Sequence, residues 1–214
     1  MGLAMVADTV PFWPHDLVGF DPLFLLNQER PDWVMVMKET VFFAVIRRVD
    51  LRNGALPIGI RGKQRHERWG GWLDPQAVRE RWTPESLVAR ISDLPGERLN
   101  TVPALAGLRT LYQRLEHSTW RWGPTGSVGF ELATGLATAT QGSDLDLIVR
   151  CREPVTKQEA CCLLAKTFDL GVRCDIALET PIGAVSLIEF TKTEGAVALK
   201  TLVGPKLTTN PWVE

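Results

Sequence analysis

The sequence has little of several features that would point to a particular class of protein. Its 214 residues include four cysteines without a Cys-x-x-Cys pair, and its three histidines lack the spacing of metal ligands. A zinc site is therefore not expected. A chain of this length needs no disulfide scaffold, so we expect buried, reduced thiols in a cytoplasmic protein. No run approaches 18 apolar residues and residues 1–10 lack a basic segment, so we expect neither a membrane span nor a signal peptide.

The chain also lacks an excess of charge of either sign. Lys+Arg 24 and Asp+Glu 25 give a net charge of -1, which excludes a general polyanion binder and argues against a nucleic-acid partner. Residues 47–90 nevertheless carry 10 basic and 5 acidic residues (+5), against -4 for residues 1–46 and -2 for residues 91–214, and these values add to -1. A local anion site in the basic stretch remains compatible with the total.

The hydrophobic pattern predicts an α+β protein in two parts. We expect a smaller α+β N-terminal domain at residues 1–94 and a C-terminal domain at residues 95–214, with a turn at residues 92–96 between them. Alternating strands and helices in the second part favour a mixed sheet with helices on one side. The clearest predicted elements are strands at 33–37, 41–46, 145–151 and 172–178 and a helix at 102–117.

Asp144 and Asp146 are the first candidates for chemistry. Residues two apart in a strand project to the same face, so the two carboxylates would repel by about 2–3 kcal/mol at an effective dielectric of 20. A divalent cation removes that repulsion, and carboxylate oxygens suit Mg²⁺ (or Mn²⁺). A bare Asp-x-Asp pair also occurs as two solvated carboxylates at the start of a strand, so this pattern needs support from elsewhere in the chain.

Two further features supply that support. Gly126 and Ser127 lie in a turn before a short helix, where backbone N–H groups and a hydroxyl can hold a phosphate. Asp175, in the predicted strand 172–178, is a third carboxylate that a neighbouring strand could bring to the pair. His15 stands beside Asp16, which predicts a hydrogen bond with a structural role.

Taken together, these pieces resemble the nucleotidyltransferase superfamily, in which a Gly-Ser turn precedes an Asp-x-Asp strand and a later strand brings a third acid. The gap from Ser127 to Asp144 is longer than usual, and the extra length falls in residues 134–142. Residues 122–135 and 143–147 resemble, more narrowly, the malonate decarboxylase holo-acyl-carrier-protein synthase family, also called phosphoribosyl-dephospho-CoA transferases. Residues 14–17 and 57–62 resemble it as well.

The resemblance implies transfer of a 2'-(5''-phosphoribosyl)-3'-dephospho-CoA prosthetic group from its triphosphate form, triphosphoribosyl-dephospho-CoA, to a serine of the apo acyl carrier protein subunit of malonate decarboxylase, with release of pyrophosphate. It implies metal-binding and catalytic roles for Asp144, Asp146 and Asp175. It implies substrate binding by Gly126, Ser127 and Ser143.

The basic segment 61–68 adds Arg61, Lys63 and Arg65 to the predicted substrate-binding residues. They would contact the donor's phosphates or an acidic carrier protein, and the alternative is a solvated loop. Two other functions stay open: a small nucleotidyltransferase acting on a citrate lyase carrier, RNA, a drug or another protein, and a non-catalytic nucleotide-binding module. The three intact acids argue against the module.

Overall fold

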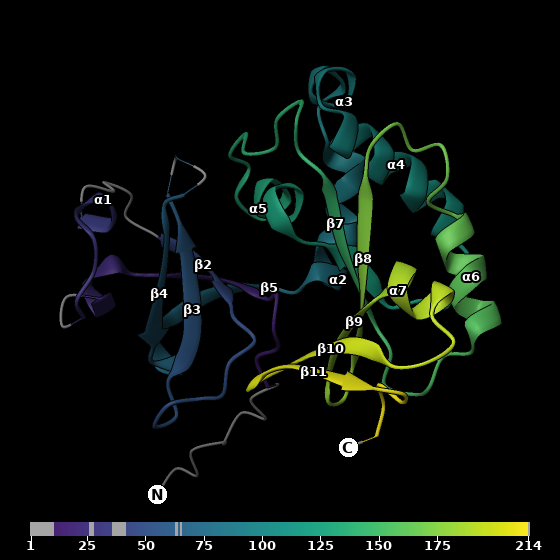
Figure 1. Cartoon of the computed structure of the whole chain (residues 1–214). Coiled ribbons are helices and arrows are strands. Elements are labelled where there is room, and N and C mark those ends of the chain that lie inside the picture. The colour runs from purple at the N-terminus through teal and green to yellow at the C-terminus, as the bar shows by residue number, and fades with distance from the viewer. Residues whose placement is uncertain (1–10, 26–27, 36–41, 63, 65, 214) are drawn as a thin grey trace, which may run out of the picture.

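The structure contains two β-sheets, each with its own hydrophobic core (Figure 1). It is a computed structural model that describes residues 11–25, 28–35, 42–62, 64 and 66–213. A six-stranded mixed sheet with helices occupies the C-terminal part and a smaller sheet the N-terminal part, so the predicted α+β class is confirmed. In the described part of the chain, every helix is too short or too polar to cross a membrane.

The N-terminal sheet has five antiparallel strands in the order β4-β3-β2-β1-β5. One face buries a compact core that includes Val18, Phe20 and Ile58. The strands are β1 (Leu17–Phe20), β2 (Phe42–Ile46), β3 (Leu56–Arg61), β4 (Arg68–Leu73) and β5 (Val78–Trp82), and the short helices of this part are η1 (Pro22–Leu25), α1 (Asp32–Met35) and η2 (Pro75–Ala77).

Two expectations for this part need correction. The strand predicted at residues 33–37 is wrong where the structure describes it, because Asp32–Met35 form one helical turn that buries Val34. A short apolar run does not distinguish a strand from a buried helical turn. The basic segment is not simply a loop, since Arg61 ends β3 and pairs with Arg68 at the start of β4. The other two predicted basic site residues, Lys63 and Arg65, lie outside the described residues.

Short helices lead from the first sheet into the second core. Thr83 caps α2 through a hydrogen bond from the Ser86 N–H, and proline occupies the first helical turn, as is usual at a helix start. Leu87 and Ile91 then pack into the C-terminal core. These helices are α2 (Pro84–Leu87), η3 (Val88–Asp93) and α3 (Gly96–Thr101).

The C-terminal sheet has the order β11-β10-β9-β8-β7-β6, in which β7 and β8 are parallel and the other pairs antiparallel. Leu145, Leu147 and Val149 alternate into the core, so the intervening residues of β7 project to the other face. The strands are β6 (Trp122–Pro124), β7 (Leu145–Arg150), β8 (Cys174–Thr180), β9 (Gly183–Ser186), β10 (Val197–Thr201) and β11 (Gly204–Thr208). The helices are α4 (Pro103–Leu115), α5 (Gly126–Thr134), α6 (Lys157–Ala165) and α7 (Leu187–Lys192).

The cysteines are all free, but they are not all buried. Cys151 is buried and Cys174 half-buried, whereas Cys161 and Cys162 are exposed on α6. The expectation of buried thiols is wrong for that adjacent pair, because α6 turns Ala160 and Leu163 into the core and the two cysteines between them away from it.

Candidate functional site

The parallel pairing of β7 with β8 brings Asp146 and Asp175 together. The two residues are direct partners in the register, and their side chains therefore project to the same face of the sheet. Asp144 is exposed and lies one residue before β7 begins. Two of the three predicted acids thus occupy adjacent strand positions, and the third lies at the edge of the same face.

Asp146 lies against the start of α5. An ideal Cβ on Gly126 would stand 2.4 Å from Asp146 Oδ2, and the φ of Gly126 is +59°, so both space and backbone conformation require glycine there. The Thr125 N–H donates a 2.8 Å hydrogen bond to the Asp146 carbonyl. The first turn of α5, whose N–H groups have no partner within the helix, therefore borders this carboxylate.

The electrostatics of Asp146 are those of a charge without full compensation. Burial is the largest effect and raises its pKa, and the nearby carboxylates of Asp175 and Asp144 raise it further. His15 and Arg173 act in the opposite direction. A half-buried carboxylate among like charges gains from a bound cation.

The three acids do not form a ready-made metal cluster. Across the described ranges, no three His, Cys, Asp or Glu side chains are grouped so that they could hold an ion. Asp175 instead pairs with Arg173 at 3.0 Å between Oδ2 and Nη2. Oxygen donors of this kind fit Mg²⁺, and the uncompensated charge at Asp146 is consistent with it, so the Mg²⁺ site stays a prediction.

Hydrogen bonds join the two predicted serine positions. Ser127 Oγ donates to Ser143 Oγ at 3.2 Å, and Ser143 Oγ accepts from the Thr140 N–H at 2.9 Å. Thr138 Oγ1 donates to the Ser127 carbonyl at 2.9 Å. The Gly-Ser turn and the segment before Asp144 therefore form one polar strip beside the acids.

The longer loop, residues 134–142, is held in place by a buried carboxylate. Glu131 accepts from Arg98 Nε and Nη2 at 2.9 and 2.8 Å and from the Ala139 N–H at 2.8 Å, while Arg98 also donates to the Ala139 carbonyl. Burial by itself raises the pKa of Glu131, but the bonds from Arg98 and the backbone lower it overall. The extra residues are thus anchored at their midpoint on α5 and α3.

An ionic network that sequence reasoning missed joins the two sheets. Fully buried Asp16 accepts from Arg81 Nη2 at 2.6 Å and lies 3.4 Å from Arg150 Nη2. Buried Glu179 on β8 pairs with Arg48, which follows β2. No local sequence pattern predicts these ion pairs, because the paired residues lie 65 to 134 positions apart in the chain.

His15 belongs to this network and not to a pair with its neighbour. Its Nε2 lies 3.5 Å from Glu179 Oε1, and the backbone N–H of His15 donates to the Ile46 carbonyl at 3.0 Å. The predicted structural role thus involves Glu179 and not Asp16. His15 is also one of the groups that lower the pKa of Asp146.

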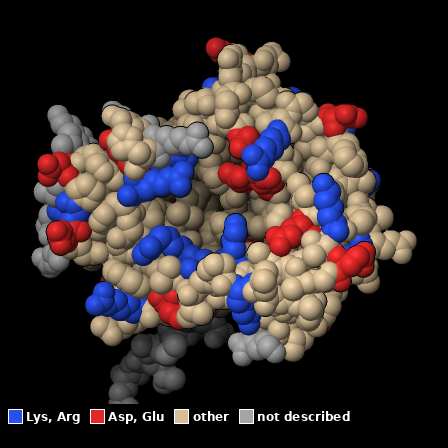
Figure 2. All heavy atoms as spheres, in the orientation of Figure 1, with Lys and Arg blue, Asp and Glu red and all other residues tan. Residues whose placement is uncertain are grey.

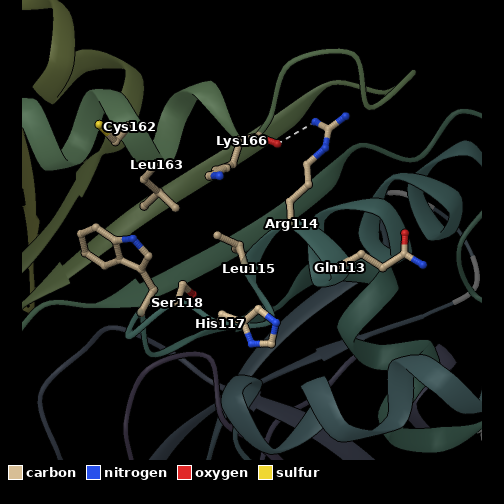
Figure 3. A pocket seen from close by; sticks show the side chains of 9 residues that line it. Gln113, Arg114, Leu115, His117, Ser118, Cys162, Leu163 and Lys166 are labelled. Atoms are coloured by element: carbon tan, nitrogen blue, oxygen red, sulfur yellow. Dashed lines mark hydrogen bonds between the residues drawn. The ribbon is translucent and has the colours of Figure 1, made fainter.

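A hollow opens between the two sheets on the face shown in Figure 2. Lys and Arg side chains gather on its N-terminal side, and acidic side chains lie on the opposite rim. A separate pocket of about 320 Å³ lies between α4 and α6 (Figure 3), lined by Arg114, His117 and Lys166 among others. That pocket contains none of the predicted site residues.

Comparisons with known proteins cover both parts of the chain. Residues 13–84 match the family model of the phosphoribosyl-dephospho-CoA transferase MdcG N-terminal domain, and residues 92–211 match that of its C-terminal domain. No solved structure gives a significant match.

Curated relatives agree along nearly their whole length. The phosphoribosyl-dephospho-CoA transferase of Pseudomonas syringae pv. tomato is 36% identical over 199 residues, covering 93% of this chain and 92% of that protein. That of Pseudomonas fluorescens is 37% identical over 203 residues, with 94% of each chain covered. That of Klebsiella pneumoniae strain 342 is 34% identical over 199 residues, covering 93% and 95%. The chain therefore belongs to the phosphoribosyl-dephospho-CoA transferase family and is a transferase enzyme.

Proposed function

We propose that this enzyme transfers the 2'-(5''-phosphoribosyl)-3'-dephospho-CoA group from its triphosphate donor to a serine of the apo acyl carrier subunit of malonate decarboxylase. The observation that carries the proposal is the position of Asp146. Its carboxylate is paired in register with Asp175 and lies against the first turn of α5. Negative ligands bind at helix N-termini. A pair of acids that can hold a cation next to a helix N-terminus therefore suits the binding of a triphosphate.

The reaction is a displacement at phosphorus. The carrier serine oxygen forms a bond to the α-phosphorus, the bond from that phosphorus to the α–β bridging oxygen breaks, and pyrophosphate leaves with the electron pair. The N–H groups that start α5 and the hydroxyls of Ser127 and Ser143 would bind phosphate oxygens. Asp175 would either complete the metal site or accept the serine proton.

The metal has a defined place in this scheme. Asp144, Asp146 and Asp175 are the residues that would hold Mg²⁺, which when bound supplies charge neutralisation at the triphosphate. The sheet itself holds Asp146 and Asp175 at fixed strand positions, so these residues align the donor and do not have to be gathered from loops.

The test is transfer to a purified apo carrier subunit. With the triphosphate donor and Mg²⁺, the carrier should gain the mass of the prosthetic group and release one pyrophosphate. Asp144→Ala and Asp146→Ala should each abolish the gain, while Asp50→Asn, at an exposed acid between β2 and β3, should leave it unchanged. The apo carrier of citrate lyase, tested in parallel, should react poorly. No mass gain on any carrier, or near-normal transfer by both alanine variants, would refute the proposal.

A further inference from the structure

Three arginines share one face of the N-terminal sheet. Gly59 of β3 pairs with Gly70 of β4, and Arg61 pairs with Arg68 one step along the same face. Val45 of β2 pairs with Gly59, and Arg47 follows Val45 by two residues. Because directly opposed residues and alternate residues along a strand project to the same side, all three arginines surround the glycine pair.

This face is turned toward the C-terminal part of the molecule. Phe43, two residues before Val45, contacts the ring of Phe130 on α5 with 6.2 Å between ring centroids. Val45 packs against the C-terminal core. The arginine face therefore continues outward from the contact between the two parts.

Arg47 lies flat across the two glycines. Its Cγ is 3.3 Å from the place that a Cβ on Gly59 would take, and its Nη1 is 2.8 Å from that of Gly70. Two opposed glycines weaken a strand pair, and glycine in a strand often marks the close approach of a ligand to the backbone. Gly70 is exposed, so the Arg47 guanidinium lies over the glycines near the surface of the protein.

The arginines have no counter-ion among the described residues. None of the ion pairs found there involves Arg47, Arg61 or Arg68, and the buried Nε of Arg47 has no hydrogen-bond partner. Glu67, the acid of the basic segment, accepts from the Gln64 N–H of its own turn. Like charges on neighbouring strands repel, so a bound anion would stabilise this face.

We propose that this face binds the diphosphate of the donor's dephospho-CoA portion, while the acidic site around Asp146 takes the triphosphate end. The inference rests on the proposed function, because that donor carries two separate polyphosphate groups. Arginine forks bind phosphate oxygens in pairs, and the lack of side chains on the two glycines lets the Arg47 guanidinium lie flat, where a slender diphosphate chain can reach it. A carrier protein would reach exposed Arg61 more readily than half-buried Arg47.

The test measures binding of 3'-dephospho-CoA, which has the diphosphate but no triphosphate, by calorimetry. Arg47→Gln should weaken binding about tenfold or more, since a hydrogen bond to a charged group is lost. Gly70→Ala should also weaken it, because its Cβ displaces the Arg47 guanidinium. Arg52→Gln, an exposed arginine in the turn after β2, is the matched control and should bind as wild type does.

Three further readouts separate the possible outcomes. Asp146→Asn should leave dephospho-CoA binding intact, and Arg47→Gln should leave inorganic triphosphate binding intact. Should Arg47→Gln unfold, Arg61→Gln at the exposed end of the face provides the same comparison. Unchanged dephospho-CoA binding by the Arg47→Gln and Arg61→Gln variants, or a loss confined to the affinity for the apo carrier, would overturn the inference. Failure of the wild-type enzyme to transfer the prosthetic group to any carrier would reject the proposed function. The calorimetric measurement would still decide whether the arginine face binds dephospho-CoA.

Discussion

Replacing Asp146 by asparagine should stabilise the metal-free protein while abolishing transfer. The substitution keeps the shape of the side chain and removes a charge whose pKa is raised by burial and by the carboxylates of Asp175 and Asp144. When the pKa of an acid is raised in the folded state, the protein loses stability as pH rises through that pKa. The stabilisation should therefore be present at neutral pH and vanish in acid, where Asp146 is protonated in both states.

The magnitude follows from the strand pairing. Neighbouring strands lie about 4.8 Å apart, which puts the carboxylates of paired residues on the order of 6 Å apart and their repulsion at about 3 kcal/mol for a dielectric of 20. The Asp175 side chain is 41% exposed and paired with Arg173, so solvent screening reduces this to about 1 kcal/mol. For a chain of this size, that corresponds to a Tm rise of about 2–4 °C.

Thermal unfolding with and without Mg²⁺ decides the matter. With a chelator present, the Tm of Asp146→Asn should lie above that of the wild-type protein. The Tm of the control variant Asp50→Asn should equal that of the wild type. Added Mg²⁺ should raise the wild-type Tm, because a ligand of the native state stabilises it, and should raise the Asp146→Asn value much less. A lower Tm for Asp146→Asn in chelator, or an equal response of both proteins to Mg²⁺, would show that the acids form no cation site.

Three other predictions concern residues around the site. Gly126→Ala should reduce transfer at least a hundredfold, because its Cβ would stand 2.4 Å from Asp146 Oδ2; activity near wild type would contradict this close approach. Glu131→Gln should lower the free energy of unfolding by about 2 kcal/mol at neutral pH. The lowered pKa of Glu131 implies a stabilisation lost as pH falls through that pKa, so denaturant melts should show the difference shrinking in acid. Burial raises the pKa of Cys151 and Cys174 to about 12, so mass spectrometry of the folded protein after mild alkylation should find both unmodified.

The sequence predicted the local elements near the acids well, because periodicity is a local property. The predicted helix at 102–117 is α4, with its leucines on the buried face. The strand predicted at 145–151 contains β7, and the one predicted at 172–178 overlaps β8, which begins and ends two residues later. Short apolar runs were less informative, as the helical turn at Asp32–Met35 shows. There, packing of Val34 into the core decided the conformation.

What the sequence determined by itself was the α+β class, the common face of alternate residues in β7, and a glycine and a hydroxyl group at the position where α5 begins. Only the tertiary structure decided that Asp175 stands opposite Asp146, that His15 meets Glu179, and that Arg47 crosses two glycines. Each of these contacts joins residues from different strands or from different sheets. Strand register and the packing of one sheet on another set such contacts. Neither produces a periodic pattern in the sequence from which the contacts could be predicted.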